Sequence, residues 1–188
     1  MSRKSTDKRG MLVKAADKLV YSQGFHETTL ADIAAQAGIP LGNLYYYFKT
    51  KEELGSAIIE RRANYYSGLA AEWDKQAEPE TRIAAFIEYV EGRREYLSRS
   101  GCPIGSLCQE LHKGDAGSLA EQATAIFTGQ LKWLEGQFLA LGCEGASGDH
   151  ALHLLSAMQG AALLTHTFGD PELIQRESAR VKEWVKAL

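Results

Sequence analysis

The sequence lacks a hydrophobic run long enough to cross a membrane. Its longest apolar stretch, residues 151–168, is interrupted by His153, Gln159 and His166, whereas a membrane-spanning helix needs about 20 mostly apolar residues. The polar and basic start MSRKSTDKRG is followed by no apolar segment, so no secretory signal peptide is predicted. We therefore expect a cytoplasmic protein with no membrane partner.

Cysteine is also scarce, with three residues in a chain of 188. A small, odd number argues against the disulfide framework of a secreted protein and favours a reducing cytosol. The sequence contains no glycine-rich phosphate loop and no paired-carboxylate site. No cofactor is predicted, and an enzyme is not the expected class.

Charge is low overall, with a net value of −3, which taken alone argues against a nucleic-acid partner. Its distribution is uneven, however. Residues 1–51 contain eight Lys and Arg against four Asp and Glu, a balance of +4, while the remainder of the chain carries −7. A basic start on an acidic body is the asymmetry expected when one end of a protein meets a polyanion.

Apolar residues recur with helical periodicity along almost the whole chain, which predicts an all-α fold. A first helix carries a stripe from Leu12 to Val20 and ends at Gly24. The capping-box sequence Thr29-Leu-Ala-Asp32 opens a second helix, which Gly38 ends. Further helices are predicted at residues 40–48, 51–76, 79–98, 103–113, 116–141, 149–167 and 171–187. The first three, two of them joined across Gly38, form a helix-turn-helix pattern.

The third predicted helix carries three consecutive tyrosines, Tyr45, Tyr46 and Tyr47. At 100° per residue, Leu44 and Phe48 fall on one face and can pack inward, while the tyrosines point in other directions. A single short helix cannot bury every side. Exposed phenols beside Lys49 and Lys51 suit a nucleic-acid backbone, because tyrosine and lysine side chains commonly donate to phosphates.

The stretch TTLADIAAQAGIPLGNLYYYFKTKEEL resembles the DNA-binding motif of the tetracycline-repressor (TetR) family of bacterial regulators. The matching positions are Thr28-Thr29, Ile33-Ala34, Ala37-Gly38, Gly42, Leu44-Tyr45, Phe48, Lys51 and Leu54. The resemblance implies a homodimer that places two recognition helices in successive major grooves of a double-stranded, palindromic DNA operator. It also implies a helix-turn-helix DNA-binding domain at residues 1–50 and a helical effector-binding and dimerisation domain at residues 51–188.

Carried over by position, the resemblance assigns phosphate contacts to Thr28 or Thr29, to Tyr45, Tyr46 and Tyr47, and to Lys51, with Lys49 beside them. Leu41, Gly42 and Asn43 are expected to approach base edges. Family members often have Ser or Thr where this chain has Pro40, and a basic residue at Leu41. Few side chains are therefore expected to contact base edges directly. Asn43 is expected to hydrogen-bond to adenine, and Leu41 to contact the methyl group of thymine. Specificity should depend partly on DNA shape.

The last two helices are expected to form the dimer interface. Small residues there allow close helix approach, and leucines supply bulk for a helix-bundle seam. The small residues are Ala157, Gly160, Ala161 and Ala162, and the leucines are Leu154, Leu155, Leu163 and Leu164. The alternative is that these residues form the core of a monomer. Abundant aromatic residues in the same half suggest an apolar small-molecule effector.

The segment GCPIGSLCQELHK, residues 101–113, is a candidate redox sensor. Pro103 suits the first position of a helix, so Cys102 is a predicted N-cap, where a thiolate is favoured. Cys108 lies one turn before His112, whose imidazole could assist that thiol. The alternative is that both cysteines are small buried hydrophobes. Three soft ligands fall short of the four that a structural zinc site needs, so no metal site is predicted.

The sequence thus favours a transcriptional regulator, most often a repressor in the family it resembles, released from its operator by a small apolar ligand or by cysteine modification. Two other functions stay open at this point. One is a small thiol-dependent enzyme using Cys102 or Cys108, and the other is a helical adaptor that binds proteins through its tyrosine-rich helix. The charge asymmetry and the capped helix-turn-helix favour the regulator.

Overall fold

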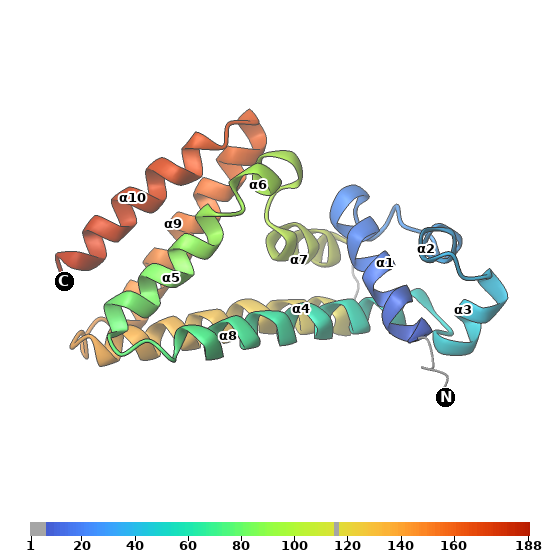
Figure 1. The fold of residues 1–188 in the computed structure, drawn as a ribbon, viewed down its shortest axis with the longest axis horizontal. Helices are drawn as coiled ribbons and strands as arrows, with labels where there is room; N and C mark the ends of the chain where they lie inside the picture. The colour runs from blue at the N-terminus through green and yellow to red at the C-terminus, as the bar shows by residue number, and fades with distance from the viewer. Residues whose placement is uncertain (1–6, 115–116) are drawn as a thin grey trace, which may run out of the picture. The chain divides into compact units, whose positions relative to one another are not determined.

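A computed structural model describes residues 7–114 and 117–188, and within these ranges the chain forms helices and no strand (Figure 1). The all-α prediction is confirmed. The helices are α1 (Lys8–Gln23), α2 (Leu30–Ala37), α3 (Leu41–Tyr47), α4 (Lys51–Trp73), α5 (Pro79–Glu91), α6 (Arg94–Ser100), α7 (Pro103–Lys113), α8 (Ser118–Ala140), α9 (Ser147–Phe168) and α10 (Glu172–Lys186). Among the described residues, no helix is both long enough and apolar enough to span a membrane.

The chain packs as two compact units, each built from two stretches of sequence. The first unit comprises Met1–Ala63 and Ser106–Thr124, and the second comprises Asn64–Gly105 and Ala125–Leu188. Helices α4, α7 and α8 each contribute residues to both units. The functional division at residues 1–50 and 51–188 stays a prediction, because packing units alone do not assign functions.

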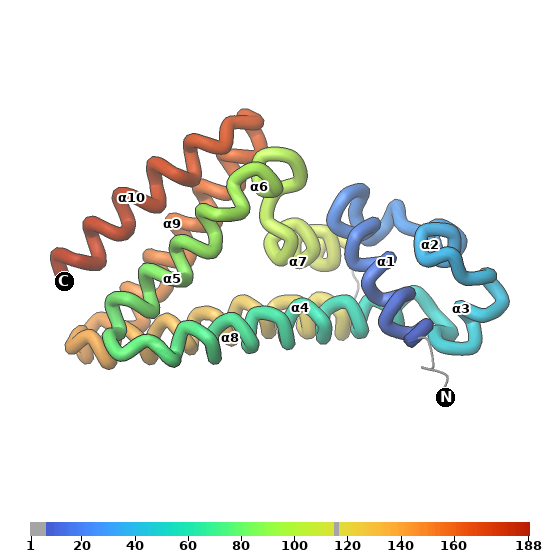
Figure 2. Tube along the Cα trace, in the orientation of Figure 1, coloured from blue at the N-terminus to red at the C-terminus, as the bar shows by residue number. Residues whose placement is uncertain are grey.

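The first unit holds α1, α2 and α3 on the start of α4 around a small apolar core. Helix α1 packs on α2, and α2 on α3 (Figure 2). Leu12 from α1, Leu44 from α3 and Leu54 from α4 are almost fully buried together with Ile33 and Phe48. The inward stripe predicted for the first helix and the inward Leu44 and Phe48 are therefore confirmed.

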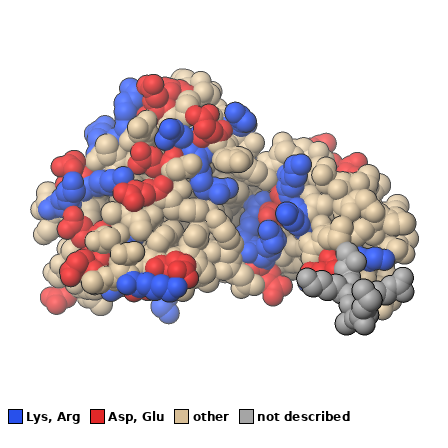
Figure 3. Space-filling model, in the orientation of Figure 1, with Lys and Arg blue, Asp and Glu red and all other residues tan. Residues whose placement is uncertain are grey.

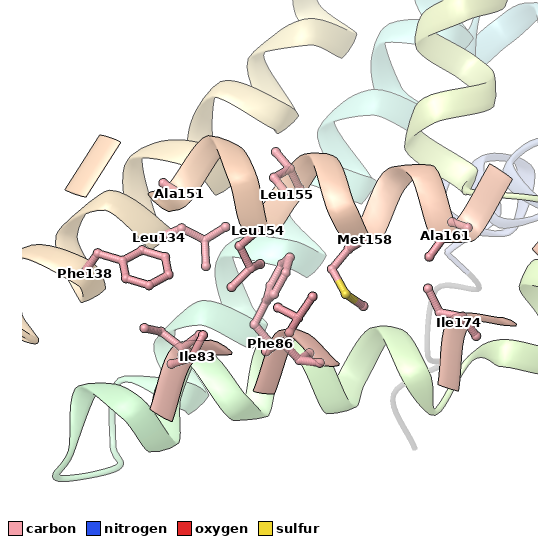
Figure 4. Packing of buried hydrophobic residues seen from close by; sticks show 14 of the residues in the cluster. Ile83, Phe86, Leu134, Phe138, Ala151, Leu154, Leu155, Met158, Ala161 and Ile174 are labelled. Carbon is pink, nitrogen blue, oxygen red and sulfur yellow. The ribbon is translucent and has the colours of Figure 1, made fainter. Parts of the chain in front are cut away.

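The second unit has a larger core made by α5, α8, α9 and α10. Ile83 and Phe86 from α5 face Leu154 and Met158 from α9, and Leu134 from α8 joins them (Figure 4). Helix α9 also packs against α6 and α10. Leu154, Leu155, Ala161 and Ala162 are buried inside this core. For these four residues the monomer-core alternative holds, and the predicted role in a dimer seam is wrong.

One predicted helix is divided in two. The expected helix at residues 79–98 breaks after Glu91, and α6 starts at Arg94. A Cβ at Gly92 would lie 3.2 Å from the carbonyl oxygen of Glu88, closer than side chains normally approach. Glycine also destabilises a helix interior. The chain turns at Gly92 and Arg93, and this break sets the position of the Arg93 side chain.

Candidate nucleic-acid interface

The turn between α2 and α3 is defined by local hydrogen bonds at both of its ends. Thr29 caps α2, because its Oγ1 accepts a hydrogen bond from the Asp32 amide at 3.1 Å, while the Asp32 carboxylate accepts from the Thr29 amide at 3.0 Å. The hydroxyl of Thr29 also donates to Asp32 at 2.6 Å, and this bond lowers the pKa of Asp32. Gly38 ends α2 in the left-handed region at φ 66°, which glycine adopts without strain.

Helix α3 is anchored on one side only. Leu44 and Phe48 are buried, whereas Tyr46 is 77% exposed and Tyr45 is 45% exposed. Tyr47 is half-buried, and its ring meets that of Tyr46 edge to face at 5.1 Å. The helix thus presents phenols to solvent from a backbone held in place by its buried side, as the 100° spacing predicts.

The first residues of α3 are also accessible. Leu41 and Asn43 are exposed, and a Cβ built at Gly42 would meet no atom within 4 Å. A duplex could approach the backbone closely at that glycine. Helix α3 contains no charged residue, and α2 contains only Asp32. The surface over these helices is accordingly mostly uncharged in Figure 3.

The two lysines that follow α3 also serve the fold. Lys49 donates from Nζ to the carbonyl oxygen of Tyr45 at 2.7 Å, which satisfies a carbonyl at the end of α3. Lys51 donates to the carbonyl oxygen of His26 at 2.9 Å and lies 4.8 Å from the centre of the Phe25 ring. Burial lowers the pKa of Lys51, against the attraction of nearby carboxylates. Lys49 is the more exposed of the two cations.

Thr28 differs from its neighbour Thr29. Its side chain is fully buried, and its Oγ1 donates to the carbonyl oxygen of Gly24 at 2.6 Å. A buried hydroxyl that already has an acceptor cannot also donate to a phosphate. Of the two threonines, Thr29 alone remains in the proposed interface, and Thr28 supports the turn after α1.

Glu110 in α7 is a residue that sequence reasoning missed. Its carboxylate accepts hydrogen bonds from the backbone amides of Phe25, at 2.8 Å, and His26, at 2.6 Å. These bonds hold the segment between α1 and α2 in place. Lys51 stabilises the same segment by donating a hydrogen bond to the carbonyl oxygen of His26. The partners are 84 and 85 residues apart in sequence, so no local pattern indicates them.

The predicted sensor residues lie in α7 or at its start. Cys102 precedes Pro103, the first residue of α7, and its Sγ accepts from the Gly105 amide at 3.4 Å. The predicted N-cap position is therefore observed. Nδ1 of His112 lies 2.8 Å from the carbonyl oxygen of Cys108. Because a carbonyl only accepts, that nitrogen carries the proton and cannot act as a base on the thiol.

A sensing role for Cys102, Cys108 and His112 stays a prediction. All three side chains are at least partly accessible, although Cys102 belongs to the second unit and the other two to the first. Within the part of the chain that the structure describes, no three His, Cys, Asp or Glu residues gather in a way that could hold a metal ion.

Comparison with known proteins agrees with this geometry. The profile of the family described as "Bacterial regulatory proteins, tetR family" matches residues 12–58. The HTH-type transcriptional regulator RutR of Escherichia coli strain K12 is 31% identical over 150 residues, which cover 69% of this chain and 68% of RutR. Transcriptional regulator AcuR of Cereibacter sphaeroides is 28% identical over 147 residues, 74% of this chain and 65% of AcuR. The chain therefore matches about two thirds of the length of each relative.

Solved structures show the same fold over nearly the whole chain. The TetR-family regulator SCO4454 from Streptomyces coelicolor aligns with a TM-score of 0.82 and 20% identity, over 95% of this chain and 93% of that one. The reduced form of E. coli NemR aligns with a TM-score of 0.81 and 24% identity, over 94% of this chain and 96% of that one. The shared fold, the matching helix-turn-helix and the relative that is 31% identical lead to one conclusion: the chain belongs to the TetR family of bacterial transcriptional regulators.

Proposed function

We propose that this regulator is a repressor that binds a palindromic operator as a homodimer through α3 and leaves it when a small molecule binds or a cysteine is modified. The observation that carries the proposal is the one-sided anchoring of α3. Its buried Leu44 and Phe48 hold the helix, and its exposed Tyr45 and Tyr46 face solvent. Nothing in the fold of the first unit requires two exposed tyrosines side by side.

In the proposed complex the backbone contacts come from Thr29, the three tyrosines and Lys49. Phenol and hydroxyl groups donate to phosphate oxygens and orient the protein without reading sequence. Lys51 adds positive charge next to them, although its Nζ is shared with the His26 carbonyl. Leu41, Gly42 and Asn43 enter the major groove, where Asn43 is the one side chain of the three able to make a bidentate contact with adenine.

The dimer interface is assigned to an exposed apolar strip on α9. Leu152, Leu163 and Leu164 are all about half exposed or more, and Phe168 is 70% exposed. Gly160 lies between them, and a Cβ there would meet no atom within 4 Å. At 100° per residue, Leu152, Gly160 and Leu163 lie within about 80° of one another around α9, and Leu164 and Phe168 extend the exposed surface to one flank. A second copy of the strip would cover this surface, and two linked half-sites bind DNA far more tightly than one.

The test is binding of the full-length protein, with reduced thiols, to the DNA upstream of its own coding sequence, measured by gel shift. The wild-type protein should bind, and the double variant Tyr45→Phe, Tyr46→Phe should bind about tenfold more weakly, because two hydrogen bonds of about 1 kcal/mol each are lost in part. Tyr65→Phe is the matched control, since Tyr65 is exposed in the second unit. Equal affinity of the double variant and the control would contradict the proposed role of α3.

A further inference from the structure

The second unit contains a hollow lined by residues of α4, α5, α6, α8 and α9 and by the start of α7. Its apolar wall includes Phe86, Leu97 and Ile104, all of them buried. The empty volume is about 440 Å³ including open solvent at the mouth, of which about 30 Å³ can be occupied by the centre of a water molecule. Space of that size holds a water or two. An occupant must therefore be small, or must sit partly in the mouth or displace side chains.

Arg93 lines this hollow without a carboxylate partner. Among the described residues it forms no ion pair, and the residues lining the hollow include no Asp or Glu. Its guanidinium carbon lies over the rings of both Tyr89 and Tyr96, 5.6 Å from each ring centre. Stacking of this kind fixes the plane of the guanidinium and leaves its N–H edge available as a fork of donors.

Three further polar side chains line the hollow. The hydroxyl of Tyr89 is buried beside those of Tyr65 and Tyr66, and it makes no hydrogen bond of good geometry among the described residues. The amides of Gln130 and Gln159 line the same space and are partly exposed. Burial raises the pKa of Tyr89, so its phenol remains a donor at physiological pH. Buried polar groups normally have partners, and an orphan group indicates a missing ligand or water.

Two acids that precede Arg93 in sequence are already engaged elsewhere. Glu88 and Glu91 of α5 both accept from Nζ of Lys182 in α10, at 3.3 and 3.2 Å. They cannot neutralise Arg93 without giving up that lysine. Glu95, two residues after Arg93, is exposed and is not part of the lining. Among the described residues that line the hollow, Arg93 therefore has no counter-charge.

We infer that this hollow binds a small organic carboxylate, with the carboxylate on the guanidinium edge of Arg93 and an apolar body against Phe86, Leu97 and Ile104. A planar carboxylate matches the guanidinium fork with two parallel hydrogen bonds. One cation neutralises one negative charge, whereas a phosphate dianion would need a second. The neutral apolar effector expected from the aromatic composition would leave the guanidinium of Arg93 without a counter-charge, which is unfavourable. The regulatory consequence of this binding depends on the proposed function, but the binding itself does not.

The experiment compares acids with their uncharged amides of the same shape. Benzoate against benzamide and butyrate against butyramide are titrated into the full-length protein by isothermal calorimetry and by thermal shift. At least one acid should bind about tenfold more tightly than its amide, which is the usual worth of a charge-assisted pair. Arg93→Gln should abolish that preference, and Arg94→Gln, on the exposed next residue, should keep it. Inorganic phosphate should bind more weakly than the preferred acid.

Each outcome decides the inference. If neither acid binds more tightly than its amide, or if Arg93→Gln binds as the wild type does, the inference is wrong. The comparison of acid with amide uses the wild-type protein, so it remains decisive even if the Arg93 variant fails to fold. A gel shift on the same preparation separates the two proposals. DNA binding without acid binding overturns this inference alone, and acid binding without DNA binding overturns the proposed function alone.

Discussion

At the scale of single residues, two identical neighbours in the sequence can differ in burial and in the groups that they contact. Thr28 and Thr29 are adjacent, yet the hydroxyl of Thr28 is buried on the Gly24 carbonyl and that of Thr29 is exposed at a helix cap. Arg93 and Arg94 are also adjacent, and Arg93 alone lines the hollow. A one-residue step on a helix or turn moves a side chain by about 100°, which is enough to reverse its exposure.

Asn43→Ala should relax the sequence preference of DNA binding without a large loss of general affinity. If Asn43 makes a bidentate contact with adenine, its removal costs about 1–3 kcal/mol at one or two base pairs of each half-site. The measurement is a selection of binding sites from randomised duplexes. Asn64→Ala, an exposed asparagine in α4, is the control. An unchanged binding profile for Asn43→Ala would remove this residue from the base-reading set.

At the scale of helices, most of the secondary structure could be predicted because its signals are local. Capping residues, glycine stops and apolar periodicity placed α2, α3 and α7 within a residue or two. The break at Gly92 was missed, because a lone glycine is tolerated inside many helices. The role of Glu110 was missed because its partners come from the far end of the sequence. Leu154 and Leu155 were assigned to the wrong face, because α9 has apolar residues on both of its sides.

The cap of α2 gives a pH-dependent prediction. The Thr29 hydroxyl lowers the pKa of Asp32, so the stabilisation from this pair is present above the ordinary carboxyl pKa and is lost as the pH falls through the lowered value. Thr29→Val removes the hydroxyl and should raise the pKa of Asp32, as followed by carbon NMR of its carboxyl group. Thr50→Val removes the hydroxyl that caps α4 and should leave Asp32 unchanged. A pKa of Asp32 that is equal in all three proteins would contradict this assignment.

Glu110→Gln tests the contact that α7 makes within the first unit. The substitution keeps the shape but turns one acceptor of the Phe25 and His26 amides into a donor. It should reduce the free energy of unfolding by about 1–3 kcal/mol, measured by urea denaturation. Gln109→Ala, on the exposed neighbouring residue, should have little effect. Equal denaturation midpoints for the two variants would show that the Glu110 bonds contribute nothing to stability.

At the scale of the whole molecule, two packed units serve two proposed tasks. The first unit carries the exposed tyrosines of α3, and the second carries the exposed strip of α9 and the hollow with Arg93. Helix α7 belongs to both, since its first residues line the hollow and Glu110 lies in the first unit. Sequence patterns could locate the DNA-binding half, because its motif is contiguous. The hollow could not be located in this way, because its lining comes from segments far apart in the chain.

Leu163→Glu should convert a dimer into a monomer without unfolding it. Leu163 is 59% exposed in the single chain, so a charge there costs little until a second copy covers it. Light scattering after gel filtration gives the mass, and operator affinity should fall by more than tenfold. Leu139→Glu, at an exposed leucine of α8, should remain a dimer. A wild-type monomer, or a Leu163→Glu dimer, would contradict the assignment of the interface.

The most direct test of the central claim is the salt dependence of DNA binding by the reduced, ligand-free protein. Fluorescence anisotropy with the upstream duplex gives the affinity at several salt concentrations. Each neutralised phosphate contributes about −0.9 to the slope of log affinity against log salt. Lys49 and Lys51 of two protomers together therefore predict a slope of about −4. Binding that does not change with salt, or no binding to any duplex at low ionic strength, would contradict the account.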